Sequence, residues 1–216
     1  MKKKSRFLVF VLCALMFAFV VERTDFSSPV RSADTSKGWK LMVVNSEYRV
    51  PKNYELEFVS LSCGEKVEKR IYPDLQDMFD DALSEGIDLV VRSGYRSEEE
   101  QKQLLIKKIG ELRNEGFSDN KARTEALRWV SMPGTSEHHL GFAVDINAEN
   151  GTKEEKAYKW LSDNAHKYGF ILRYPSDKTD ITGIAYEPWH FRYVGKSHAK
   201  EIYNQGLCLE EYVETL

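Results

Sequence analysis

Two short stretches, far apart in the chain, constrain its fold more than any other feature. Residues 136–145 read Ser-Glu-His-His-Leu-Gly-Phe-Ala-Val-Asp, and residues 187–190 read Glu-Pro-Trp-His. Together they offer two well-placed imidazoles, one carboxylate suited to bind a metal ion and a second, free carboxylate. A catalytic zinc ion typically takes three ligands from His, Asp and Glu and leaves one position open to water. We therefore expect the two stretches to meet in the fold and form a hydrolytic zinc site.

The alternation of side chains along strands predicts how these residues meet. Residues 142–147 and 190–194 have the pattern of strands, and every second residue of a strand lies on the same face. If the face that carries Asp145 meets the face that carries His190, both side chains can bind one ion. His138 would reach the same ion from the loop before the first strand.

The remaining residues of the two stretches have expected roles as well. Gly141 permits the backbone turn after the loop, and Pro188 keeps Glu187 out of a helix, in a bend that could aim its carboxylate at the open zinc position.

Taken singly, an Asp in a strand is often a structural carboxylate, and a His is more often a surface or core residue than a ligand. The zinc-helix signature H-E-x-x-H is absent. Three histidines are expected not to be ligands: His139, His166 and His198.

A second polar group stands where a strand gives way to a helix. Arg96 directly precedes Ser97, which forms a predicted capping box with Glu100. The free N–H groups and the dipole of a helix N-terminus favour an anion at such a place. An Arg exposed to solvent beside a capping box is the simpler interpretation. Gln101, a polar residue on the apolar stripe of the same helix, favours a binding pocket shared with Arg96.

Hydrophobic periodicity predicts an α+β fold in which helices flank a small, mostly antiparallel central sheet. Helices are expected at residues 73–86, 97–112, 118–129, 152–168, 199–203 and 209–216. Ser97, Ser118 and the pair Thr152 and Glu155 are the predicted caps of three of these helices. Strands are expected at residues 88–91, 142–147, 170–174 and 190–194.

Length and composition favour one folded domain. The chain has 216 residues, of which 42% are hydrophobic, and its formal net charge of -3 gives no basic footprint for nucleic acid.

A basic start followed by a short apolar run predicts an export signal, so residues 1–26 are expected to be a signal peptide or a signal-anchor that enters the membrane at least during export. Residues 27–38 then form a flexible tether, and residues 39–216 form the zinc-binding domain. Cys63 and Cys208 could be bridged, or they could be two separately buried thiols.

The sequence resembles the VanY-type D-alanyl-D-alanine carboxypeptidases, within the group of zinc peptidases that includes lysostaphin-like enzymes and the hedgehog fold. The pattern Ser-x-His-x-x-Gly-x-Ala-x-Asp is complete, as is Glu-x-x-His at residues 187–190. The resemblance implies zinc bound by His138, Asp145 and His190, with Glu187 as general base. It also implies that the C-terminal end of the peptide and the developing oxyanion contact Arg96, Gln101 and Ser136, with Tyr174 lining the pocket.

The activity that this resemblance implies is removal of the terminal D-Ala from peptidoglycan stem peptides or their precursors. We expect the protein to be a monomer that acts outside the cytoplasm, either anchored in the membrane or secreted to the cell wall. Loss of that D-Ala would lower glycopeptide binding, which makes antibiotic resistance an expected role. Three alternatives remain open: an L,D-carboxypeptidase, a cross-link endopeptidase and a non-catalytic binding module. Glu187 argues against the last, because a structural zinc prefers a closed shell of four ligands.

Overall fold

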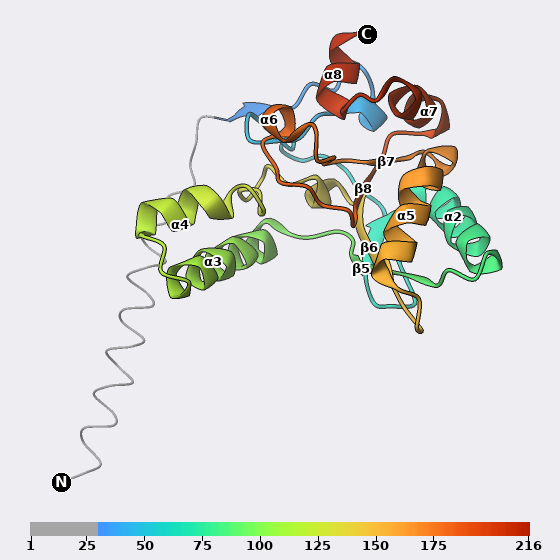
Figure 1. Cartoon of the computed structure of the whole chain (residues 1–216). Helices are drawn as coiled ribbons and strands as arrows, with labels where there is room; N and C mark the ends of the chain where they lie inside the picture. The colour runs from blue at the N-terminus through green and yellow to red at the C-terminus, as the bar shows by residue number, and fades with distance from the viewer. Residues whose placement is uncertain (1–29) are drawn as a thin grey trace.

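A four-stranded antiparallel sheet lies at the centre of the structure, a computed structural model that describes residues 30–216 (Figure 1). The strand order is β5-β6-β8-β7, so the two strands that carry the sequence motifs are central neighbours. This confirms the expected α+β fold. The strands of this sheet are β5 (Leu89–Ser93), β6 (Ala143–Ala148), β7 (Phe170–Leu172) and β8 (His190–Tyr193).

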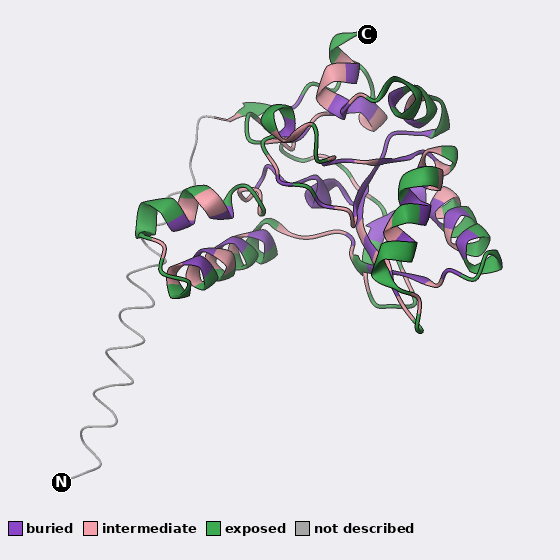
Figure 2. Cartoon of the chain, in the orientation of Figure 1, coloured by how far each residue is buried: buried purple, intermediate pink, exposed green. Residues whose placement is uncertain are grey.

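The main hydrophobic core lies between this sheet and two helices, α2 (Tyr72–Ser84) and α5 (Glu154–Asn164) (Figures 1 and 2). Val144 and Ile146 of β6 are fully buried in it, whereas Asp145 between them is only partly buried. Alternate residues of a strand lie on opposite faces. The core therefore holds one face of β6 and leaves the Asp145 face for the site.

Two further helices, α3 (Glu98–Asn114) and α4 (Asp119–Ala126), form a pair that we call the helical lobe, residues 98–126. The lobe lies to one side of the sheet (Figure 1). It has a small core of its own, made by Leu105, Ile109, Leu112, Ala122 and Ala126. The lobe is therefore stabilised largely by its own contacts.

A third cluster of buried residues joins the C-terminal part of the chain to the sheet. It contains residues of α7 (Lys196–Gln205) and α8 (Leu209–Glu214) together with Ile171 of β7. A short helix, α6 (Thr179–Thr182), lies between β7 and β8 in the sequence. The 3-10 helices are η1 (Trp39–Leu41), η2 (Lys69–Ile71), η3 (Glu137–Leu140) and η4 (Ala165–Tyr168).

The predicted helix caps have mixed outcomes. The capping box of α3 is present: the Glu100 N–H donates to Ser97 Oγ, and the Ser97 N–H donates to Glu100 Oε2 at 2.8 Å. Ser118 precedes α4 but makes no side-chain cap bond. The cap predicted from Thr152 is wrong, because its hydroxyl accepts from the backbone N–H of Asp88 at 3.0 Å and α5 begins at Glu154.

The folded part begins earlier than the predicted tether allows. β1 (Arg31–Ser32) pairs in parallel with β2 (Tyr48–Arg49), and Ala33 is 6% exposed. The boundary at Trp39 is therefore corrected, since residues 31–33 already pack on the domain. A hairpin of β3 (Phe58–Ser60) and β4 (Lys66–Glu68) was also not predicted.

The expected signal or anchor, residues 1–26, lies outside the described part of the chain. Within residues 30–216, no helix is long and apolar enough to cross a membrane. Cys63 is exposed and Cys208 is buried, and both are free thiols. The two thiols are therefore separate, but the expectation that both are buried is wrong for Cys63.

Candidate active site

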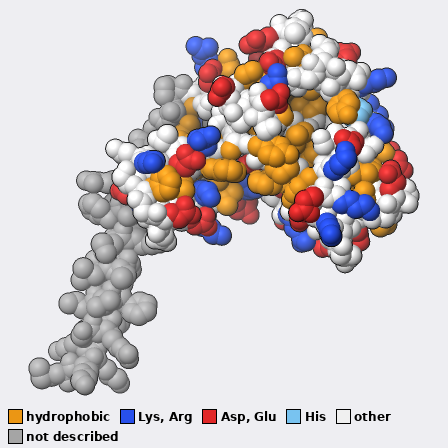
Figure 3. Space-filling model, viewed as in Figure 1, with side chains coloured by type: hydrophobic (Ala, Val, Ile, Leu, Met, Phe, Trp, Pro, Cys, Tyr) orange, Lys and Arg blue, Asp and Glu red, His pale blue; other side chains and the backbone are white. Residues whose placement is uncertain are grey.

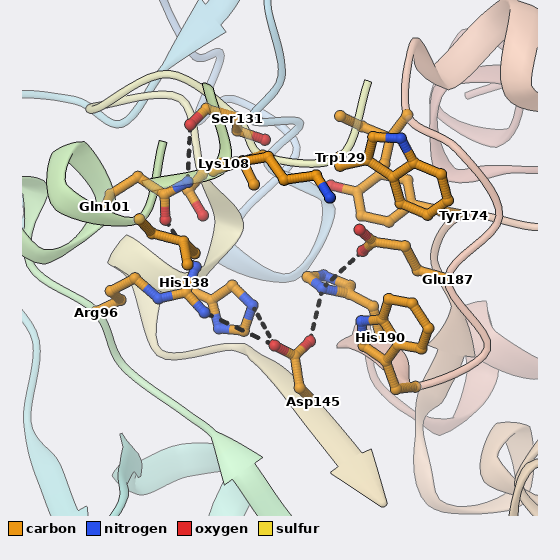
Figure 4. Close-up of a pocket in the computed structure, with 15 residues that line it drawn as sticks. Arg96, Gln101, Lys108, Trp129, Ser131, His138, Asp145, Tyr174, Glu187 and His190 are labelled. Carbon is orange, nitrogen blue, oxygen red and sulfur yellow. Dashed lines mark hydrogen bonds and ion pairs between the residues drawn. The ribbon is translucent and has the colours of Figure 1, made fainter. Parts of the chain in front are cut away.

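Asp145 and His190 meet because β6 and β8 pair in a register that places these two residues directly opposite each other. His190 Nδ1 lies 3.0 Å from Asp145 Oδ1, and His138 Nε2 lies 3.4 Å from Asp145 Oδ2 (Figure 4). One ligand atom from each of the three residues lies within 4.8 Å of the others. The structure thus brings together the three residues expected to bind a metal ion.

The backbone around Gly141 brings His138 to this point. Gly141 ends η3 in the left-handed region at φ 64°, and a Cβ there would lie 2.9 Å from the backbone N of Glu68. Glycine is needed for both reasons. His138 Nδ1 lies 2.7 Å from the carbonyl oxygen of Gly94, to which it donates. That bond leaves the lone pair of Nε2 directed toward Asp145.

The electrostatics of the three residues favour a bound cation. Burial opposes charge on Asp145, but the two imidazoles outweigh it and hold the pKa of Asp145 well below its usual range. Burial lowers the pKa of His138. Burial also disfavours charge on His190, yet the carboxylates of Asp145 and Glu137 raise the pKa of His190 to about 9. The carboxylate of Asp145 and the two imidazoles therefore converge on one point, at which positive charge is favoured.

The same residues fit a metal ion in their bonding. Asp145 Oδ1 is buried and makes no hydrogen bond of acceptable geometry within the described chain. Two imidazole nitrogens and a carboxylate oxygen are common zinc ligands, and the second nitrogen of His138 has the carbonyl partner that often accompanies a ligating imidazole. This donor set fits zinc.

Glu187 lies beside His138, Asp145 and His190 but is not one of the residues whose ligand atoms converge within 4.8 Å. Its Oε2 is 3.7 Å from His190 Nδ1 (Figure 4), and a turn between the two residues is closed by the His190 N–H donating to the Glu187 carbonyl at 3.1 Å. Burial raises the pKa of Glu187 to about 7. A carboxyl group with a pKa near neutrality is well suited to exchange protons at physiological pH.

Arg96 lies on the opposite side of Asp145, with its Nη2 3.7 Å from Asp145 Oδ2. Its guanidinium donates to Gln101 Oε1 and to Ser93 Oγ, each at 2.7 Å. The Gln101 amide in turn donates to the carbonyl of Ser131 at 2.7 Å. Gln101 therefore holds Arg96 in place with both ends of its amide occupied.

The assembled residues open into a pocket of about 390 Å³. Ser136 and Tyr174, two residues expected to contact substrate, line it. His139 is directed elsewhere, since its Nδ1 donates to the Arg96 carbonyl at 2.6 Å and its Nε2 accepts from the Gly134 N–H at 3.0 Å. His139 therefore orders the loop that carries Arg96.

Sequence reasoning missed several residues of the pocket wall. Leu104 and Lys108 come from α3, and Trp129 follows α4. Figure 3 shows hydrophobic side chains gathered on the surface where the helical lobe adjoins the rest of the molecule. Leu104 and Trp129 are 36% and 39% exposed, and this exposure depends on how the chain packs in three dimensions. The signal in the sequence was that Leu104 lies off the buried stripe of α3.

Glu137 was also missed. It lies between two residues of the motif and is 1% exposed, which is unusual for a carboxylate. Its position between Ser136 and His138 was the available signal.

Comparison with known proteins places these features in a family. Residues 64–196 match the family described as VanY, D-alanyl-D-alanine carboxypeptidase. A D-alanyl-D-alanine carboxypeptidase of Enterococcus faecalis (strain ATCC 700802 / V583) is 48% identical over 178 residues, which cover 82% of this chain and 66% of the relative. The chain thus spans slightly less than two thirds of the length of that relative.

Solved structures show the same similarity in three dimensions. A mutant of the vancomycin resistance D,D-pentapeptidase VanY in complex with Zn(II) has a TM-score of 0.80 and 48% identity, covering 81% of this chain and 99% of its own. VanYB in complex with D-alanine-D-alanine has a TM-score of 0.81 and 48% identity, covering 82% and 98%. Two L,D-carboxypeptidases also match: LdcB at 38% identity with a TM-score of 0.66, and DacB of Streptococcus pneumonia at 34% identity with a TM-score of 0.63.

Proposed function

The chain belongs to the VanY family of D-alanyl-D-alanine carboxypeptidases, and on this basis we propose that it is a zinc-dependent enzyme that removes the C-terminal D-Ala from peptidoglycan stem peptides or their precursors. One observation carries the proposal. The donor atoms of His138, Asp145 and His190 converge within 4.8 Å of one another at a pocket that also holds Glu187 and Arg96.

In this proposal His138 binds zinc through Nε2, His190 through Nδ1 and Asp145 through its carboxylate, because these are the atoms that face one another. A zinc ion held by three protein ligands supplies Lewis acidity, which polarises a carbonyl and lowers the pKa of water. The remaining chemistry falls to the protein's own side chains.

Glu187 is the proposed general base. Its carboxylate accepts a proton from the attacking water and returns it to the nitrogen of the departing D-Ala, so that the C–N bond breaks with a neutral amine leaving. The burial that raises the pKa of Glu187 to about 7 supports this role, because the group can then both take up and release a proton near neutrality.

Arg96 is proposed to bind negative charge, either the C-terminal carboxylate of the peptide or the oxyanion that develops at the scissile carbonyl. Its bonds to Gln101 and Ser93 fix the guanidinium while it faces the pocket. Gln101 then acts on the peptide through Arg96. Ser136 and Tyr174 line the same pocket and complete the proposed binding site.

We favour cleavage of D,D over L,D peptides because identity to the D,D enzymes is 48%, against at most 38% for the L,D enzymes. The test is to incubate the purified protein with pentapeptide and tetrapeptide stems and to identify the released amino acids, with and without a chelator. Release of D-Ala from the pentapeptide alone, abolished by the chelator and restored by zinc, is the expected result. Release from the tetrapeptide alone would establish the L,D alternative. Cleavage only of cross-linked peptides would establish an endopeptidase, and binding without turnover a recognition module.

The substrate also bears on where the protein acts. Action on peptidoglycan is consistent with a place outside the cytoplasm, so we propose extracytoplasmic action, with the N-terminal segment as the export signal or membrane anchor and the enzyme working as a monomer. Removal of the D-Ala terminus would contribute to glycopeptide resistance. Expression in a susceptible host, with the minimal inhibitory concentration of vancomycin as readout and Glu187→Gln as control, tests that role.

A further inference from the structure

A buried carboxylate stands behind the candidate metal ligands. Glu137 has a side chain that is 0% exposed, and its Oε1 accepts from Arg173 Nε and from Arg192 Nη1, both at 2.8 Å. Both arginine side chains are also 0% exposed. Three charged side chains without access to water are costly unless each has its partners in place. One oxygen of Glu137 is thus fully used by the two arginines.

The other oxygen of Glu137 faces His190. Glu137 Oε2 lies 3.7 Å from His190 Nε2, on the side of the imidazole opposite to Nδ1, which faces Asp145. Both Oε2 and Nε2 are buried, and within residues 30–216 neither has a hydrogen-bond partner. Buried polar atoms are rarely left unpaired. At 3.7 Å the two atoms are too far apart for a hydrogen bond, and a small approach of the imidazole toward Glu137 would pair both.

The network continues to the C-terminal helix. Glu210 of α8 accepts from Arg173 at both carboxylate oxygens, at 2.6 and 2.8 Å. Arg192 Nη2 donates to the carbonyl of Met42 at 3.0 Å. Two arginines therefore balance two glutamates, and the position of Glu137 is set together by Arg173 directly after β7, Arg192 of β8 and Glu210 of α8.

We propose that Glu137 is a positioning residue for the metal site, accepting a hydrogen bond from the Nε2–H of His190 and so holding the imidazole with Nδ1 toward the ion. The inference rests on the proposed zinc-binding function. A carboxylate partner on the second nitrogen fixes the tautomer of a ligating imidazole and makes the ligating nitrogen more basic. Arg173, Arg192 and Glu210 hold Glu137 in place for this bond.

The test compares zinc affinity in two variants of the full chain. Glu137→Gln keeps the shape of the side chain, but its single carbonyl oxygen cannot serve both arginines and His190. We expect zinc to bind about 10-fold to 100-fold more weakly in competition with a chromophoric chelator. The matched control is Glu68→Gln, because Glu68 is 2% exposed and its Oε1 pairs with Arg70 Nε at 2.8 Å without contacting a candidate ligand. The control should keep the zinc affinity of the parent.

A structural role alone would give a different result. If Glu137→Gln lowers the Tm of the zinc-free protein but binds zinc within about twofold of the parent, the positioning role is wrong. A parent protein that binds no zinc would instead overturn the proposed function. The visible spectrum of the Co(II)-loaded variant is a second readout, and a spectrum identical to that of the parent also contradicts the inference.

The parent protein gives a test that holds even if Glu137→Gln does not fold. In the zinc-loaded parent, labelled with ¹⁵N at histidine, Nε2 of His190 should carry a proton and Nδ1 should carry none. Nδ1 protonated and Nε2 free would overturn the proposal. Glu210→Gln, which leaves Glu137 intact, should weaken zinc binding by less than Glu137→Gln does; an equal or larger loss would place the positioning role elsewhere.

Discussion

The two walls of the pocket are built differently. The metal side consists of His138, Asp145 and His190 on the central strands and η3, and its two histidines are 3% and 4% exposed. The peptide side includes Leu104 of the helical lobe and Trp129, which follows the lobe in the sequence; they are 36% and 39% exposed. The metal side rests on the main core, whereas α3 and α4 pack around their own.

Substitutions on the metal side and on the peptide side should have different effects. On the metal side, His138 is held from behind by its bond to the Gly94 carbonyl, and the ligands lie on paired strands of the main sheet. The peptide side is connected to it mainly through Arg96, which pairs with Gln101 of α3 and lies 3.7 Å from Asp145. Changes on the two sides should therefore separate zinc binding from peptide binding.

The largest expected effects lie on the metal side. His190→Ala should lose both zinc and activity, because it removes a proposed ligand. Glu187→Gln should keep zinc and lower kcat by about 10²-fold to 10⁴-fold, because it removes a base but no ligand. Metal analysis and steady-state kinetics on the same samples check both. Near-normal turnover of Glu187→Gln would exclude Glu187 as the base.

Arg96 tests the connection between the two sides. If it binds the terminal carboxylate, a C-terminal amide substrate loses a charge-assisted contact worth about 2 to 4 kcal/mol, or about 30-fold to 1000-fold in kcat/KM. Arg96→Ala should lower activity on the free acid, narrow the difference between acid and amide, and leave zinc content unchanged. Equal kcat/KM for acid and amide in the parent would favour the cross-link endopeptidase.

The pH profile tests the state of the base. Because burial raises the pKa of Glu187 to about 7 and only the carboxylate can accept a proton, kcat/KM should rise with pH up to that value. A bound cation nearby favours the carboxylate, so the midpoint of the acid limb should lie at or below pH 7. Below the midpoint the rate should fall about tenfold per pH unit. A profile with no acid limb at any pH at which the zinc-loaded protein stays folded would contradict this assignment.

The smallest expected effect on turnover comes from the core of the helical lobe. Leu105 is fully buried there, one turn after Gln101, and Leu105→Ala should cost about 2 to 5 kcal/mol of stability within the lobe. KM for the peptide should rise severalfold while zinc affinity stays at the parent value. Ile146→Ala is the control, since Ile146 is fully buried next to Asp145 and should lower zinc affinity too. Loss of zinc in Leu105→Ala would show that the two sides are not separable.

Local patterns in the sequence predicted the regular elements well. The capping box at Ser97 and the stripe through Leu105 depend only on contacts within one helix, so the start of α3 and its buried face could be predicted. The short strands β1 to β4 could not. Strands of two or three residues have too few alternating positions to detect, and their pairing depends on tertiary contacts such as the burial of Ala33.

The sequence by itself determined which side chains could form the site, because the motif spacing and the alternation of strands fix which residues share a face. It could not determine the register that sets Asp145 opposite His190, nor the enclosure of Glu137, Arg173 and Arg192. Charged residues are normally expected at the surface. Only the packing of β7, β8 and α8 around them supplies the partners that make their burial possible, and those partners lie tens of residues apart in the sequence.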